Sequence, residues 1–146
     1  MLHGYDDQGS QFDKDGNNVN WWSEADLKNF QARTGKLVAQ FDDYVSIDNL
    51  HVKGQLTLGE NIADLGGLTV AYDALQLELA NKKMQAVDGF SQDQRFFMNW
   101  ATVWRRNFTP DELKVRLNTD SHAPANFRAI GAPSNMDSFA AAFNCK

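Results

Sequence analysis

Apolar residues recur at helical spacing in two long stretches of the chain. Between residues 23 and 46 they are three, four or seven positions apart: Leu27, Phe30, Leu37, Phe41 and Tyr44. A second series steps by three or four positions through residues 58–79. Such spacing places apolar side chains on one face of an amphipathic helix. The pattern therefore predicts one helix over residues 23–46 and another that starts near residue 58 and ends at the polar Asn81-Lys82-Lys83.

Three shorter helices are predicted further along the chain. Ser91 is a suitable N-cap for a helix whose aromatic face spans residues 96–104. Thr109 precedes Pro110 and two acidic residues, which is typical of a helix start. The last helix is expected over residues 134–143. Turns around short extended pieces are expected over residues 1–20, a linker with a short extended piece over residues 48–57, and an irregular segment over residues 119–133. The predicted fold is therefore mainly α with little strand.

The length and charge of the chain limit the classes of protein to which it can belong. With 146 residues the chain is expected to form a single domain over residues 1–146. Its net charge of −5 disfavours a protein that binds nucleic acid through its phosphates. No apolar run approaches the about 18 residues that a membrane-spanning helix needs. The single cysteine, Cys145, excludes an internal disulfide and a multi-cysteine metal site.

The predicted helix over residues 58–79 has an unusual back face, the side opposite its apolar residues. Glu60 and Asp64 are followed at helical spacing by Gly67, Ala71 and Ala74, where a solvated face would carry long polar side chains. Small residues allow another element to approach closely, and that element would partly bury the two carboxylates. Buried carboxylates are costly unless they are paired, hydrogen-bonded or bound to a metal. The alternative is a pair of acids that simply stabilises the helix dipole.

Three segments carry a family resemblance. They are His-Gly-Tyr-Asp-Asp-Gln-Gly at residues 3–9, Gly-Glu-Asn-Ile-Ala-Asp-Leu-Gly-Gly at residues 59–67, and Asn-Thr-Asp-Ser-His-Ala-Pro-Ala-Asn-Phe-Arg at residues 118–128. In this order they resemble the catalytic region of the neprilysin/endothelin-converting-enzyme family of zinc metallopeptidases, and the likeness runs over essentially the whole chain. The resemblance implies the helical C-terminal part of a thermolysin-like (zincin) metallopeptidase catalytic domain.

The resemblance also implies a zinc site. The family binds one zinc ion with two His of an H-E-x-x-H helix and a Glu of an E-x-x-x-D helix. His3 matches the second of those His, Glu60 the third ligand, and Asp64 the carboxylate that orients a ligand His. Three protein ligands leave an open position for a water. The metal lowers the pKa of that water, and a Glu takes its proton as general base.

Five further residues match family positions that face the substrate. His122 matches the His that donates to the oxyanion at the scissile carbonyl, and Asp120 matches its supporting carboxylate. Arg128 matches an Arg that contacts a substrate carbonyl. Val103 and Trp104 match residues lining the pocket for the side chain just after the cut bond. The structural alternatives are a loop His beside an Asp, a surface salt bridge, and core packing on an aromatic helix face.

The chain also departs from the family pattern. Met1 and Leu2 occupy the two intervening positions of H-E-x-x-H, so the first His and the general-base Glu would lie before them. His3 and Glu60 alone are too few for a catalytic zinc site. We therefore expect residues 1–146 to be a fragment of a larger catalytic domain, inactive without the upstream remainder of the same polypeptide. The parent protein is expected to cleave small peptides outside the cytoplasm.

Two other functions remain open on the sequence alone. The chain could be a non-catalytic helical interaction module that holds a partner through the aromatic face of residues 96–104. Residues 13–24 also place oxygen-bearing side chains at several EF-hand positions, counted from Asp13. However, Asn18 stands where that loop requires glycine. We therefore predict a turn there and do not expect calcium as a partner.

Overall fold

The computed structural model of this chain describes residues 2–82 and 84–145, so the predictions that involve Met1 and Lys83 lie outside the described residues. The mainly α fold class is confirmed. In chain order the elements are η1 (Leu2–Tyr5), η2 (Gly9–Gln11), α1 (Glu24–Asp42), β1 (Val45–Ile47), β2 (Leu50–His51), α2 (Leu58–Leu79), α3 (Gln92–Val103), α4 (Pro110–Thr119), α5 (Ala125–Gly131), η3 (Pro133–Asn135) and α6 (Asp137–Phe143).

Helix starts follow the predicted capping residues. The hydroxyl of Ser23 accepts the backbone N–H of Asp26 at the start of α1. Ser91 and Gln94 form a reciprocal capping box at the start of α3. Thr109 caps α4 with Pro110 in the first turn. Side chains that satisfy the first free N–H groups of a helix can thus be recognised from local sequence.

Three predicted boundaries were wrong. The last helix begins at Asp137 rather than at residue 134, because Met136 is extended between η3 and α6. α1 ends at Asp42 rather than near residue 46, because β1 and β2 form a small antiparallel hairpin directly after it. Asp48 and Asn49 make its turn with φ values of 48° and 60°, a conformation that Asn and Asp tolerate. The segment 119–133 is not wholly irregular, since it contains α5. The carbonyl of Pro124 accepts the N–H groups of Phe127 and Arg128, so this proline starts a helix.

The core consists of two clusters along α2. The first joins α1, α2, α4 and α5 through Leu37, Phe41, Val52, Leu58, Leu117, Ala123 and Phe127. The second joins α2, α3, η3 and α6 around Leu68, Phe97, Ala132 and Met136. Phe97 is only 2% exposed and packs against Tyr72 and Phe139. Most of the aromatic face of α3 is therefore used for internal packing, which speaks against its proposed role in holding a partner.

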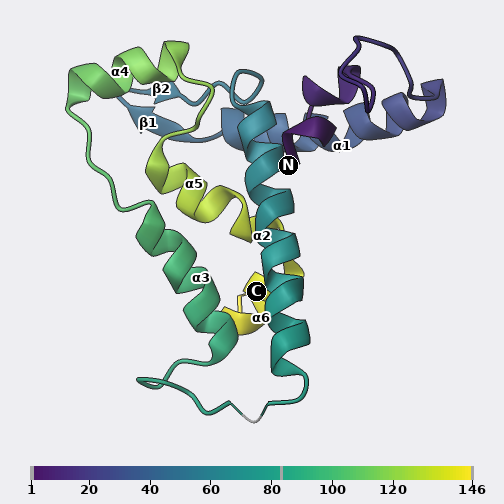
Figure 1. The fold of residues 1–146 in the computed structure, drawn as a ribbon. Helices are drawn as coiled ribbons and strands as arrows, with labels where there is room; N and C mark the ends of the chain where they lie inside the picture. Colours follow the sequence, from purple (N-terminus) through teal and green to yellow (C-terminus); the bar gives the residue numbers. More distant parts are fainter. Residues whose placement is uncertain (1, 83, 146) are drawn as a thin grey trace.

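Figure 1 shows α2 as the long central helix, with α3 running antiparallel beside it and α5 between them. η1 packs against the first half of α2. A Cβ on Gly67 would lie 3.3 Å from the side chain of Leu2, so the predicted close approach occurs there. Ala71 and Ala74 are exposed, so the covered back face is confined to the first half of the helix. Among the described helices, none combines the length and apolar character needed to cross a membrane.

The acidic stretch around Asp13 forms the predicted turn. The carboxylate of Asp13 accepts the backbone N–H groups of Asp15 and Asn17, both at 2.9 Å. The backbone of Gly16 follows with a φ of +83°, in the left-handed region that glycine adopts without strain. Oδ1 of Asp13 therefore accepts the hydrogen bonds that close a local turn.

Candidate active site

The first turns of α2 carry the two acids of the predicted site. Glu60 lies in the first turn and Asp64 one turn later, so both point to the same side of the helix. Their side chains are 20% and 11% exposed, respectively. η1 and the segment that links α4 to α5 cover this end of α2. The two carboxylates are thus largely withdrawn from solvent, and both have cationic or imidazole partners.

His3 in η1 faces Glu60. Its Nε2 lies 3.6 Å from Oε1 of Glu60, and its Nδ1 lies 2.7 Å from Oδ2 of Asp6. The other oxygen of Asp6 accepts the backbone N–H groups of Gln8 and Gly9 at 2.9 and 2.7 Å. Asp6 therefore ties the imidazole to a tight turn. A Cβ on Gly9 would overlap the carbonyl oxygen of His3, which explains the glycine.

Asp6 is a site residue that sequence reasoning missed. Burial raises the pKa of its carboxyl, but hydrogen bonds from Gly9, His3 and Gln8 outweigh burial and hold the pKa below its ordinary value. An ionised Asp6 accepts the Nδ1–H of His3, which leaves Nε2 as an electron-pair donor facing Glu60. The available signal was the three-residue separation of His3 and Asp6, which brings side chains together within a helical turn.

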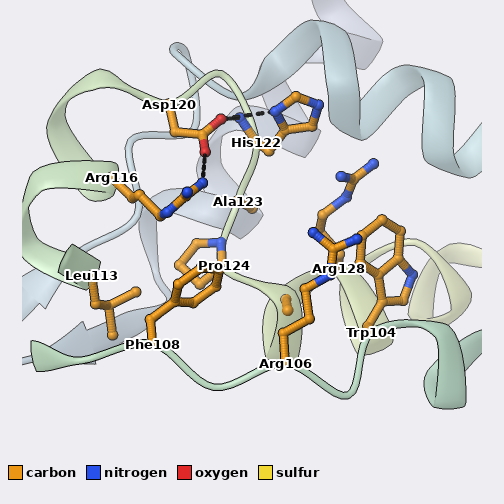
Figure 2. A pocket seen from close by; sticks show the side chains of 11 residues that line it. Trp104, Arg106, Phe108, Leu113, Arg116, Asp120, His122, Ala123, Pro124 and Arg128 are labelled. Carbon is orange, nitrogen blue, oxygen red and sulfur yellow. Dashed lines mark hydrogen bonds and ion pairs between the residues drawn. The ribbon is translucent and has the colours of Figure 1, made fainter.

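His122 approaches Glu60 from the segment between α4 and α5. Its Nε2 lies 3.1 Å from Oε2 of Glu60. Oδ1 of Asp120 lies 2.8 Å from Nδ1 of His122 and also accepts its backbone N–H at 2.9 Å. Figure 2 shows Asp120 between His122 and Arg116, whose Nη1 donates to Oδ2 of Asp120 at 2.7 Å. The structure thus brings His3, Glu60 and His122 together, with Asp120 behind His122.

The carboxyl of Asp120 is held in its charged form. Burial raises its pKa, but hydrogen bonds from the backbone and ring of His122 and from Arg116 lower it below the ordinary aspartate value. A charged Asp120 fixes the orientation of the imidazole of His122. The predicted pairing of these two residues is therefore present in the structure.

Arg128 in α5 contacts Asp64 through two parallel hydrogen bonds. Its Nε and Nη2 donate to the two carboxylate oxygens at 2.7 and 2.6 Å. Nη2 also lies 3.8 Å from Oε2 of Glu60, and the guanidinium lies 3.9 Å from the ring centroid of Trp104. The resemblance assigns Asp64 to a ligand His, but among the described residues the side chain that donates to the Asp64 carboxylate is Arg128.

Trp104 and Val103 differ in their surroundings. Trp104 lines a cavity of about 460 Å³ together with His122, Arg128 and Asp120. Val103 does not line this cavity, and its side chain is 57% exposed. The structure therefore brings Trp104, but not Val103, to the other predicted site residues.

The donor set fits part of a zinc site. His3 offers an imidazole nitrogen and Glu60 a carboxylate oxygen, two of the ligand types that zinc takes in proteins. Within residues 2–82 and 84–145, no group of three or more His, Cys, Asp or Glu side chains has an arrangement that could hold a metal. The described residues thus supply two converging donors, one fewer than a catalytic zinc site has.

Comparisons with known proteins agree with the resemblance seen in the sequence. The model of the family described as Peptidase family M13 matches residues 1–146. The endothelin-converting enzyme homolog of Locusta migratoria is 43% identical over 148 residues, which cover 99% of this chain and 20% of the relative. Neprilysin-11 of Caenorhabditis elegans is 40% identical over 150 residues, covering 99% of this chain and 18% of the relative.

Solved structures show the same architecture. The inhibitor complex of zinc metalloprotease Zmp1 from Mycobacterium tuberculosis matches with a TM-score of 0.94 and 41% identity, over 99% of this chain and 23% of that one. PepO from Lactobacillus rhamnosis matches with a TM-score of 0.82 and 34% identity, over 99% and 21% of the two chains. This chain spans about a fifth of the length of the curated relatives it matches.

Proposed function

This chain belongs to peptidase family M13, and on that basis we propose that it supplies part of the active site of a zinc metalloendopeptidase that cleaves small peptides. The observation that carries the proposal is the convergence of two imidazoles on one carboxylate. Nε2 of His3 and Nε2 of His122 lie 3.6 and 3.1 Å from the two oxygens of Glu60. A solvated acid pair at a helix start would not gather two imidazoles from two distant segments of the chain.

His3 and Glu60 would hold the zinc ion. Asp6 supports this role because it binds Nδ1 of His3 and leaves Nε2 free to donate an electron pair. When bound, zinc polarises the scissile carbonyl and lowers the pKa of a water. Since catalytic zinc sites have three protein ligands, the remaining His and the general-base Glu would come from a further segment of a longer polypeptide.

His122 would stabilise the charge that develops on the scissile carbonyl oxygen. In its doubly protonated form the ring donates through Nδ1 to Asp120 and offers Nε2–H to the substrate. Because Asp120 is itself anchored by Arg116, the imidazole is oriented before the substrate arrives. Such preorganised donors act where charge grows in the transition state.

Arg128 would position the substrate. Two of its N–H groups are used on Asp64, and the indole of Trp104 lies against the guanidinium. The remaining N–H groups can donate to a backbone carbonyl of the peptide. Asp64 would therefore act on the substrate through Arg128, in addition to the histidine-orienting role that the resemblance assigns to it.

The family resemblance also supports an extracytoplasmic location, with peptides as substrates. One relative is named membrane metallo-endopeptidase-like 1 in Mus musculus. We expect the parent protein to act outside the cytoplasm, on peptides that reach it there.

A cleavage assay tests the proposed function. It compares a polypeptide of the relatives' full length that carries this chain with its His122→Phe variant, on an internally quenched peptide. Losing an oxyanion donor typically lowers kcat by about 10²–10³-fold. The matched control is His51→Phe, since the ring of His51 has one hydrogen-bond partner among the described residues, the backbone carbonyl of Asp42.

Chelator treatment should abolish cleavage by the full-length polypeptide, and added zinc should restore it. The isolated 146-residue chain should cleave nothing, because it contains only two of the three zinc ligands and no general-base Glu at the family position. Robust cleavage by the isolated chain, or full activity of His122→Phe, would refute the proposed function.

A further inference from the structure

The cavity beside His122 has a charged wall that includes one arginine, Arg106, with no role assigned above. It is lined by the end of α3, the loop to α4, α4 itself, the segment from α4 to α5, and α5, and it has a volume of about 460 Å³. Its apolar lining includes Phe108, Leu113 and Pro124. Figure 2 shows Arg106, Arg116 and Arg128 among the side chains that line it. The cavity thus combines an apolar wall with several guanidinium groups.

Two of these three guanidiniums are neutralised within the chain. Arg116 contacts Glu112 at 2.8 Å and Asp120 at 2.7 Å. Arg128 is paired with Asp64 at 2.6 Å. Their charges are therefore offset before any substrate binds.

Arg106 differs from both. Among the ion pairs formed by the described residues, none involves Arg106. Its guanidinium lies 5.4 Å from the ring centroid of Trp104, the same indole that Arg128 contacts. Its backbone N–H donates to the carbonyl of Trp104 at 2.8 Å, which fixes the chain as it leaves α3. Arg106 thus presents an unneutralised positive charge to the cavity, beside the residue assigned to substrate positioning.

We propose that Arg106 binds a carboxylate of the peptide substrate in this cavity and so gives the peptidase a preference for a carboxylate within the first two residues after the cut bond. The inference rests on the proposed function and extends it to substrate class. A guanidinium matches a carboxylate through two parallel N–H donors. Although the net charge of the chain is −5, Arg106 adds a local positive charge that attracts an acidic group of a peptide.

The carboxylate can come from an acidic side chain or from the C-terminus of a short peptide. Two pairs of quenched peptides separate these sources. The first pair carries Glu or Gln just after the cut bond, with an amidated C-terminus. The second pair carries Gln there and ends two residues after the cut bond in a free or an amidated carboxyl group.

The experiment measures kcat and KM for both pairs with the full-length zinc-loaded polypeptide and its Arg106→Gln and Arg105→Gln variants. Arg105 is the matched control, because it carries the same charge one residue away and does not line the cavity. For at least one of the two peptide pairs, we expect the charged peptide to have a KM about two- to fivefold lower than that of its uncharged partner. The effect is modest because the ion pair that it forms with Arg106 is accessible to solvent. Arg106→Gln should abolish the difference with little change in kcat, and Arg105→Gln should retain it.

Raising the ionic strength should weaken the preference, since exposed charges are screened. Equal KM values within both pairs, or a preference that survives Arg106→Gln, would overturn the proposal.

Binding of the same four peptides is also measured by titration calorimetry. If no peptide is cleaved, the proposed function fails. If the charged peptides bind more tightly than their uncharged partners, and Arg106→Gln removes this difference, the role of Arg106 is still supported. If charged and uncharged peptides bind equally well, that role is overturned.

Discussion

Two imidazoles of the candidate site are oriented in the same way. Nδ1 of His3 contacts Asp6, and Nδ1 of His122 contacts Asp120, so both rings turn Nε2 toward Glu60. The sequence predicted Asp120 through the family resemblance. Asp6 was missed because its role depends on the 3₁₀ turn that brings it under His3, and the local residues did not predict that turn.

Replacing Asp6 should weaken zinc binding. Asp6→Asn removes the charged acceptor of the Nδ1–H of His3, and loss of such a partner typically costs about 10–100-fold in metal affinity. Competition with a chromogenic chelator measures this in the full-length polypeptide. Asp15→Asn is the control, because it removes the same charge from an exposed residue paired with Lys14. Unchanged affinity in Asp6→Asn would contradict the assigned role.

Asp120 should make the free energy of unfolding of the chain depend on pH in the acidic range. Its pKa in the folded state is lowered, so it stabilises the fold above the ordinary aspartate pKa of about 3.9. That contribution is lost as the pH falls through the lowered folded value. Asp120→Asn should therefore be less stable than wild type near neutrality, with the difference shrinking in acid. Urea unfolding at several pH values tests this, and a difference that grows in acid would contradict it.

At the level of elements, helix starts with a capping Ser or Thr were predictable and some other boundaries were not. Ser23, Ser91 and Thr109 act locally, through bonds within one helical turn, so the sequence indicates them directly. The end of α1 depends on pairing between β1 and β2, and α5 depends on how Pro124 enters its first turn. The first effect involves neighbouring strands. The second depends on a proline, which can either interrupt a helix or start one.

The contact between α5 and α1 depends on a glycine. A Cβ at Gly131 would lie 2.5 Å from Cζ of Phe41, a fully buried ring. Gly131→Ala should therefore destabilise the chain by about 1–3 kcal/mol, as overpacking does.

Gly35→Ala is the matched control for this substitution. Nothing lies within 4 Å of a Cβ at Gly35, and alanine favours the helical conformation there. This variant should be more stable than wild type by about 0.5–1 kcal/mol. Chemical unfolding of both variants measures the two changes. Equal stability of Gly131→Ala and wild type would show that α5 does not pack on Phe41 as described.

The whole molecule brings distant segments to one end of α2. Residues 3, 60 and 122 come from a 3₁₀ turn, a long helix and an interhelical segment, and the two core clusters hold those elements along α2. The family motifs predicted which residues belong together. The unneutralised charge of Arg106 could not be predicted, since it depends on which acids Arg116 and Arg128 contact in three dimensions.

The zinc content of the purified full-length polypeptide tests the central claim most directly. Elemental analysis after dialysis should find about one zinc per wild-type polypeptide, and a large loss in Glu60→Gln, because a carboxylate ligand is removed. Glu78→Gln on the same helix is the control, since Glu78 pairs with Lys82 on the exposed surface. We expect Glu78→Gln to retain its zinc. Full retention of zinc by Glu60→Gln would contradict the assignment of this end of α2 as a metal-binding active site.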